Sequence, residues 1–260
     1  MRIARDEKIL KRRVDDYLWY DKSPTVRALR IVLNKHFSDF DNVSIFGGMV
    51  RDLARDGKAG FRSDIDLVID APAEDVKALS KRMNAKPNIF GGYGFATERW
   101  KIDFWALETS WALRAGHITA SNNDDLLKGT FFDWDAAMYD IKKRRLSVED
   151  GYCEKLNSRM LGINLIATPS SVANAVRAIK RIISWDLRPS NTLLDFIDKV
   201  ISMEGIEIVA ACERRKYGTS ICAKYKSRED LLDSISGLKN EATVGGGSPR
   251  QLELSGILHN

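Results

Sequence analysis

Cysteine and histidine are scarce in this chain of 260 residues, and their spacing argues against several kinds of site. The three cysteines, Cys153, Cys212 and Cys222, include no C-x-x-C pair. An odd number at wide spacing in a long chain disfavours a disulfide framework and a cysteine zinc site. The three histidines are too far apart in sequence to indicate a metal cluster. Unpaired cysteines suit a reducing compartment, so we expect a cytoplasmic protein.

Long apolar runs are absent as well. No stretch approaches the roughly 18 apolar residues that a membrane span needs. The charged N-terminal string MRIARDEKILKRR lacks the apolar core of a signal peptide, and we expect no membrane partner. Hydrophobic residues make up 44% of the chain, which is enough for a packed core. The net charge of +5 permits a polyanionic partner without requiring one.

The order of apolar and polar segments indicates two parts with a boundary near residue 165. Residues 1–165 are expected to form an α/β head with N-terminal helices, and residues 166–260 a helical region with a C-terminal tail. In the head, the expected elements are strands at 43–46, 63–69 and 100–107, helices at 49–55 and 73–83, a turn at 91–94, and a longer α segment from residue 124. The second part should contain amphipathic helices near 172–185 and 193–201. Its last sixteen residues, 245–260, are expected to begin as a flexible link.

A glycine pair, Gly47-Gly48, separates an expected strand from an expected helix and is suited to binding phosphate. Glycine lets the backbone approach a ligand closely, and a helix N-terminus offers free N–H groups and a positive dipole. Arg51 follows one helical turn later and can add a bidentate contact to phosphate. A glycine pair is also an ordinary tight turn, so the pair alone leaves both interpretations open.

Asp64 and Asp66 are expected on one face of a strand, because residues i and i+2 point the same way, about 6.6 Å apart. Two neighbouring carboxylates repel each other unless a cation lies between them. Carboxylate oxygens are ligands that Mg²⁺ prefers, and such a pair can hold two ions about 3.5–4 Å apart. A D-x-D string is also common on solvated surfaces. Here it follows the glycine turn, so the sequence favours metal binding.

Asp103 lies in the string RWKIDFWAL, where Ile102 and Phe104 share one strand face and Asp103 shares the other with Trp105. A carboxylate in these surroundings is expected to be largely buried and to need a partner. That partner can be a shared metal ion or a hydroxyl to be deprotonated. Equally, Asp103 can be a structural residue bonded to the backbone or to an arginine, and the sequence leaves both open.

The strings GGMVRD and SDIDLVI resemble the head domain of poly(A) polymerases and CCA-adding tRNA nucleotidyltransferases, a family of the DNA polymerase β-like nucleotidyltransferase superfamily. Weaker similarities at 124–140 and 175–181 extend the match to about residues 43–190. The resemblance implies an α/β (α+β) fold, with a head built on a mixed sheet of about five strands and a helical, neck-like region after it. It also implies transfer of a nucleoside monophosphate from an NTP to an acceptor hydroxyl, with release of pyrophosphate.

The resemblance also assigns roles to individual residues. By this match, the triphosphate cradle is Gly47 and Gly48, the Arg-Asp pair lining the nucleotide site is Arg51 and Asp52, and the catalytic and metal-binding carboxylates are Asp64, Asp66 and Asp103. The metal implied is Mg²⁺, as two ions. The match is by string for the first six of these residues, and by strand position for Asp103.

Several features of the family are missing. Gly129-Thr130-Phe131 stands where the family has Arg-Arg-Asp, with only Lys128 close by. The acidic-acidic-x-x-Arg string that reads the incoming base is absent, and its nearest imitation, Glu229-Asp230, has Asp233 in place of the arginine. The chain is also short for a body and tail that grip tRNA. We therefore expect a reduced member of the family, whose further candidate nucleotide contacts are Lys128, Arg177 and Arg181. The two arginines can equally be solvated residues of a polar helix face.

Three functions are compatible with these residues. The first is a Mg²⁺-dependent nucleotidyltransferase that extends RNA, above all a tRNA 3′ end. The basic segment 171–228, with 11 Lys and Arg against 6 Asp and Glu, favours it. The second is the same chemistry on a protein hydroxyl, as in a nucleotidylating toxin or defence enzyme that a partner protein regulates. The third is a catalytically inactive module that binds nucleotides or RNA.

Overall fold

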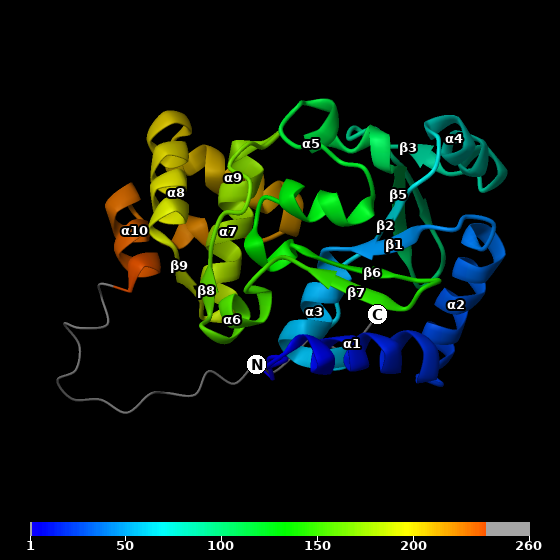
Figure 1. Ribbon diagram of the computed structural model, residues 1–260. Helices are drawn as coiled ribbons and strands as arrows, with labels where there is room; N and C mark the ends of the chain where they lie inside the picture. The colour runs from blue at the N-terminus through cyan, green and yellow to red at the C-terminus, as the bar shows by residue number, and fades with distance from the viewer. Residues whose placement is uncertain (1, 238–260) are drawn as a thin grey trace.

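The computed structural model describes residues 2–237, so the link expected at 245–260 lies outside the described residues. A mixed seven-stranded sheet forms the middle of the head (Figure 1). Its strand order is β3 (Lys86–Pro87), β4 (Tyr93–Ala96), β5 (Lys101–Ala106), β2 (Ile65–Ile69), β1 (Val43–Phe46), β6 (Ala137–Asp140) and β7 (Arg145–Val148). Strands β2 and β5 pair in parallel, and the other neighbours are antiparallel. The expected α/β (α+β) class with a mixed sheet is confirmed.

The sheet has seven strands where about five were expected, and the difference lies at its edges. Strand β3 has only two residues and pairs with β4, while β7 pairs with β6. The expected turn at 91–94 is shorter than predicted, because Tyr93 and Gly94 already belong to β4. The central strands β5, β2 and β1 are the three that the sequence motifs indicated.

One face of the sheet carries the main hydrophobic core. Ile65, Leu67 and Ile69 alternate along β2 and are fully buried on this face. Three helices cover it, namely α1 (Glu7–Asp15), α2 (Pro24–Phe37) and α3 (Gly48–Asp56), which lie along the lower side of the sheet in Figure 1. The predicted helix at 49–55 is confirmed as α3, and α4 (Ala73–Arg82) confirms the one at 73–83.

The opposite face carries a second, smaller core. Its buried members are Val68, Leu107, Leu126, Leu127 and Met138, with Phe46 and Trp105 packed against them. A 3-10 helix, Asn123–Gly129, and the short helix α5 (Trp111–Arg114) lie over this side. Because this core is small, the face leaves room beside it for polar residues at the end of the sheet.

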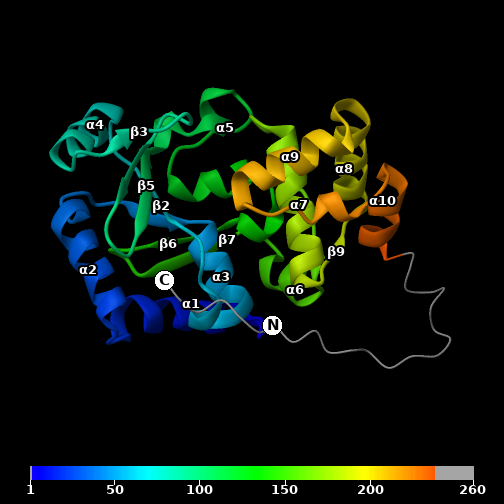
Figure 2. The same cartoon turned by 180° about the vertical axis from the view of Figure 1, so that it is seen from behind.

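A helical region follows the head and packs against it (Figure 2). It contains α7 (Ser171–Trp185), α8 (Asn191–Glu204), α9 (Ile206–Tyr217) and α10 (Arg228–Ser236), preceded by α6 (Tyr152–Asn157) and joined by the parallel pair β8 (Met160–Leu161) and β9 (Arg188–Pro189). Both predicted amphipathic helices are confirmed, with Val176, Ile179 and Ile197 buried. One continuous core runs from the sheet into these helices, and the boundary near 165 stays a prediction. No helix within residues 2–237 is long and apolar enough to span a membrane.

The expected α segment from residue 124 is wrong in part. The chain forms a 3-10 helix and then the hairpin of β6 and β7 before α6 begins. Strand β6 is fully buried because it pairs with β1, and that pairing is long-range. Its sequence, AMYD, has little local strand preference, so the tertiary pairing decides its conformation.

Candidate active site

A sharp bend at Gly47 links β1 to α3 and opens the first turn of that helix toward a cavity. Gly47 has φ +64° and ψ −104°, which is a conformation that side chains other than glycine rarely adopt. Its backbone N–H donates to the Ala137 carbonyl at 2.8 Å, which anchors the bend to β6. A Cβ atom at Gly48 would lie 3.0 Å from the Ser63 side chain. The backbone conformation therefore favours glycine at position 47, and the close approach of Ser63 favours it at position 48.

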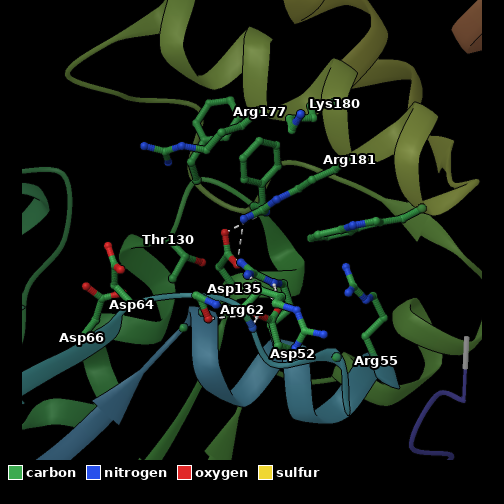
Figure 3. Close-up of a pocket in the computed structure, with 18 of the residues that line it drawn as sticks. Asp52, Arg55, Arg62, Asp64, Asp66, Thr130, Asp135, Arg177, Lys180 and Arg181 are labelled. Atoms are coloured by element: carbon green, nitrogen blue, oxygen red, sulfur yellow. Dashed lines mark hydrogen bonds and ion pairs between the residues drawn. The ribbon is translucent and has the colours of Figure 1, made fainter. Parts of the chain in front are cut away.

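The cavity has a volume of about 670 Å³ and is lined from both parts of the chain. Its basic side chains are Arg51, Arg55, Arg62, Arg177, Lys180, Arg181 and Lys216, and its acidic ones are Asp52, Asp64, Asp66 and Asp135. Figure 3 shows Asp64 and Asp66 at one end of the cavity and Arg55 at the other, with Arg181 of α7 extending toward Asp135. The excess of basic over acidic side chains and the volume of the cavity suit a polyanion of nucleotide size.

Asp52 holds together the backbone around the bend. Its Oδ2 accepts hydrogen bonds from the backbone N–H groups of Arg62 and Ser63 at 3.1 Å and from the Ser63 hydroxyl at 3.0 Å. Its Oδ1 accepts from Arg51 Nε and Nη2 at 3.0 and 2.8 Å. The Arg-Asp pair thus fixes the segment that leads into β2, and with it the position of Asp64.

Asp135 joins the head to helix α7. Its carboxylate accepts hydrogen bonds from Arg51 Nη1 at 2.5 Å and from Arg181 Nη1 at 2.9 Å, and the three side chains are at most 19% exposed. Burial disfavours the charged carboxylate, yet Arg181 and Arg51 hold the pKa of Asp135 well below its ordinary range. Burial lowers the pKa of Arg181 to about 10, and Asp135 opposes that shift.

Trp185, the last residue of α7, offers a flat aromatic face among these cations. The Arg55 guanidinium lies 4.0 Å from its ring centroid and that of Arg181 lies 5.3 Å away. Arg181 also lies 4.5 Å from the Phe132 ring. These contacts keep the arginine planes ordered without neutralising their charge, so the guanidinium groups are oriented before any anion binds.

The three predicted carboxylates lie on neighbouring strands of the sheet. Asp66 and Asp103 are register partners across the parallel pair of β2 and β5, and Asp64 immediately precedes β2. The side chain of Asp103 is 24% exposed, so it is less buried than the sequence predicted. Lys101 lies among them, with its Nζ 2.6 Å from Asp64 Oδ2 and 3.7 Å from Asp103 Oδ2.

Gly94 on β4 makes room for the Asp103 carboxylate. The two residues are register partners across the antiparallel pair of β4 and β5. A Cβ atom at position 94 would lie only 2.4 Å from Asp103 Oδ1, which is closer than such atoms approach. The absence of a side chain at Gly94 therefore sets where this carboxylate can lie.

Crowding of the carboxylates perturbs their ionisation. Burial, followed by the charges of Asp103 and Asp64, raises the pKa of Asp66 to about 7. Burial also raises the pKa of Asp103, although the Lys101 ammonium opposes this. A carboxyl group that resists ionisation in the folded protein is destabilising once it is forced to ionise.

We expect Asp66→Asn to stabilise the metal-free protein at pH 8 but not at pH 4. The folded-state pKa near 7 exceeds the ordinary value of 3.8, so the folded chain binds more protons than the unfolded chain between these values. Stability is therefore lost as the pH rises through this window. Thermal unfolding in EDTA at pH 8 should give the variant a free energy of unfolding roughly 2–4 kcal/mol higher than that of the unmodified protein. An equal difference in stability between the two proteins at pH 8 and pH 4 would contradict a raised pKa of Asp66.

The donor chemistry fits a hard divalent cation, although the side chains do not converge on a single point. Carboxylate oxygens are ligands of the kind that Mg²⁺ takes. Opposite Asp103, Gly94 has no side chain, which leaves space beside that carboxylate. Within residues 2–237, no group of three or more His, Cys, Asp or Glu side chains is arranged around one potential metal position. Metal binding by Asp64, Asp66 and Asp103 is therefore a prediction that rests on their chemistry and not on their arrangement in this structure.

The structure brings most of the predicted site residues together. The cavity is lined by Gly47, Gly48, Arg51, Asp52, Asp64, Asp66, Arg177 and Arg181. Asp103 lies on its far side, beyond Asp66, and lines a second cavity. Lys128 is exposed on the 3-10 helix and is not among the lining residues of either cavity. We therefore leave Lys128 out of the candidate site.

Several lining residues were not expected as site residues, above all Asp135, Arg55, Arg62 and Trp185. Asp135 lies within residues 124–140, where the similarity to the family is weak, and no motif there marks it as a site residue. Arg62 directly precedes the predicted strand, and its proximity to the D-x-D string was the one available signal. Glu229, the nearest imitation of the base-reading string, lies in the first turn of α10 and does not line the cavity.

Searches against models of protein families and against curated proteins find no match. Solved structures do match. The Thermotoga maritima CCA-adding enzyme in complex with tRNA has a TM-score of 0.58 at 19% identity, over 87% of this chain and 54% of that one. A CCA-adding enzyme in complex with ATP has a TM-score of 0.55 at 19% identity, over 86% and 53%.

The chain has the nucleotidyltransferase head fold of these enzymes. A tRNA-processing enzyme in its apo form agrees, with a TM-score of 0.52 at 15% identity over 89% of this chain and 61% of that one. The chain spans about half the length of the first two solved structures. The glycine bend follows the last residue of β1, and Asp64 and Asp66 at the start of β2 lie beside it in the wall of the cavity.

Proposed function

We propose that the protein is a nucleotidyltransferase that moves a nucleoside monophosphate from an NTP to an acceptor hydroxyl. The observation that carries this proposal is the position of Asp64 and Asp66 in the wall of a cation-rich cavity that also contains the Gly47 bend. Groups suited to binding phosphate and carboxylates suited to binding a metal ion thus line the same cavity. Catalytic groups combined with an anion cradle are the parts that phosphoryl transfer needs.

In this proposal, the triphosphate lies at the N-terminus of α3 and against the arginines. The backbone N–H groups after Gly47 and the side chains of Arg62 and Arg177 would orient its oxygens. Arg51 and Arg181 are already engaged by Asp135. They would therefore act through the positive field and the shape of the cavity, so that the α-phosphate is presented next to Asp66.

The transfer step is an in-line substitution at the α-phosphorus. The acceptor oxygen forms a bond to this phosphorus as the bond to the bridging oxygen of the β-phosphate breaks. Pyrophosphate leaves with the electron pair of the broken bond. The hydroxyl proton passes to the Asp103 carboxylate and from there to water. Mg²⁺ held by Asp64, Asp66 and Asp103 would supply charge neutralisation and a more acidic acceptor hydroxyl.

RNA, and in particular a tRNA 3′ end, is the acceptor that we propose. The basic excess of segment 171–228 supports it, because polyanions bind such surfaces. Solved structures of the same fold are complexes with tRNA and with ATP. No observation on this chain favours a protein hydroxyl, which remains an outcome of the experiment below.

The test is to incubate the protein with each α-labelled NTP, Mg²⁺ and total cellular RNA and protein. We expect label in the RNA fraction, concentrated in species of tRNA length, and its loss when EDTA is added. Label in the protein fraction would replace the RNA acceptor with a protein one. Absence of label in both fractions, with NTP binding retained, would contradict transferase activity.

A further inference from the structure

A second cavity of about 310 Å³ lies on the other side of the carboxylates. Asp66 and Phe46 line both cavities and form the wall between them, whereas Asp103 lines only the second. The lining also includes three aromatic side chains, Phe90, Trp105 and Trp111. The fold thus places an aromatic pocket directly against the carboxylates, opposite the cation-rich cavity.

The two cavities differ sharply in charge. Among the described residues that line the second cavity there is no Lys or Arg, and its charged members are Asp66 and Asp103. A phosphate group would be repelled there, whereas a neutral planar group would find aromatic faces. A nucleobase with its ribose is such a group, and stacking on aromatic side chains is tolerant of base identity.

Contacts within the protein hold Trp105 and the backbone of the Phe90 loop in place. The Trp105 indole donates from Nε1 to the Ser110 hydroxyl at 2.9 Å, and its ring meets Phe46 edge-on with centroids 6.1 Å apart. Asn88 Oδ1 accepts from the backbone N–H groups of Phe90 and Gly92 at 3.0 Å, which holds the loop that carries Phe90. Preorganised walls reduce the entropy that a bound group must lose.

In-line geometry determines which partner belongs in which cavity. The attacking hydroxyl must approach the α-phosphate from the side opposite to the leaving pyrophosphate. If the pyrophosphate end lies among the arginines of the first cavity, the acceptor must arrive from beyond Asp66. The second cavity lies there, and Asp103 is in its wall.

We propose that this pocket binds the 3′-terminal nucleoside of the RNA acceptor, with the base among Phe90, Trp105 and Trp111 and the ribose hydroxyls beside Asp103. The proposal rests on the proposed function and deepens it by giving the acceptor end its own binding site. It predicts that the aromatic residues govern recognition of the RNA end and leave recognition of the NTP unchanged.

The experiment uses a single-stranded oligoribonucleotide with 2-aminopurine at its 3′ end, added to the full chain without NTP. Stacking on the pocket should quench the fluorescence of this base. Phe90→Ala and Trp111→Ala should abolish the quenching and weaken binding of the RNA end between about fivefold and a hundredfold, as loss of a stacking partner does. In the transfer assay, the same variants should raise KM for RNA and leave KM for the NTP unchanged.

Ile89→Ala is the matched control, because Ile89 is 93% exposed on the same loop and does not line the pocket. An oligonucleotide with 2-aminopurine five positions from the end should show no such quenching. Unchanged quenching in both aromatic variants would overturn the pocket assignment while leaving the transferase proposal intact. Quenching without transfer to any RNA would support the pocket and contradict the proposed function. Equal quenching of end and internal probes would overturn the pocket assignment.

Discussion

Replacing Asp64 and Asp66 together with asparagine should reduce nucleotide transfer by about a thousandfold or more. The two side chains line the cavity beside the glycine bend, and Asp66 is the register partner of Asp103. Asparagine keeps the shape of each side chain but removes the negative charge that a divalent cation needs. Metal-assisted phosphoryl transfer is stabilised by several kcal/mol at such a site, and each 1.36 kcal/mol is about a tenfold change in rate.

Asp70→Asn is the control for this double variant, because Asp70 follows the same strand but lies away from the cavity. Its transfer rate should equal that of the unmodified protein. The double variant should melt no lower than the unmodified protein in EDTA, since removing the crowded charge of Asp66 relieves repulsion. Loss of transfer with normal melting then reports chemistry, whereas transfer that persists in a folded double variant would place the active site elsewhere.

The parts of the fold predicted from sequence are those set by local patterns. Helix α7 was predicted from the spacing of its apolar residues, and the strands β1, β2 and β5 from short apolar runs bounded by turn residues. Strand β6 was missed because its sequence, AMYD, has little strand preference of its own. It becomes a strand through pairing with β1, a contact between segments about ninety residues apart.

The residues of the candidate site also differ in whether a local sequence pattern indicates them. Gly47, Asp64 and Asp66 belong to short strings that predict neighbouring positions in one site, and the three residues do line one cavity. Gly94 and Asp135 act across the fold, one by leaving space for Asp103 and the other by pairing with arginines from two helices. Nothing in the residues beside them signals these roles, because their partners are distant in sequence.

Asp135→Ala should destabilise the protein by about 3–5 kcal/mol, the cost of removing one partner from a buried ion pair. Arg51 and Arg181 would then lie side by side, each at most 11% exposed, without the carboxylate that separates their charges. The folded-state pKa of Asp135 is below its unfolded value, so its stabilising contribution is complete above about pH 5 and is lost as the pH falls. Urea denaturation at pH 7 measures this loss.

Two further variants separate the charge of Asp135 from its shape. Asp135→Asn keeps the size of the side chain and one acceptor oxygen but removes the charge. A loss of stability close to that of Asp135→Ala would show that the charge is responsible. A much smaller loss would show that packing is responsible. Asp41→Ala removes an exposed partner of Lys142 and should leave the denaturation midpoint unchanged. Equal urea denaturation midpoints for Asp135→Ala and Asp41→Ala would contradict a stabilising role of the buried ion pairs of Asp135. Because the network joins the head to α7, its loss should also weaken NTP binding, by letting Arg181 leave the cavity.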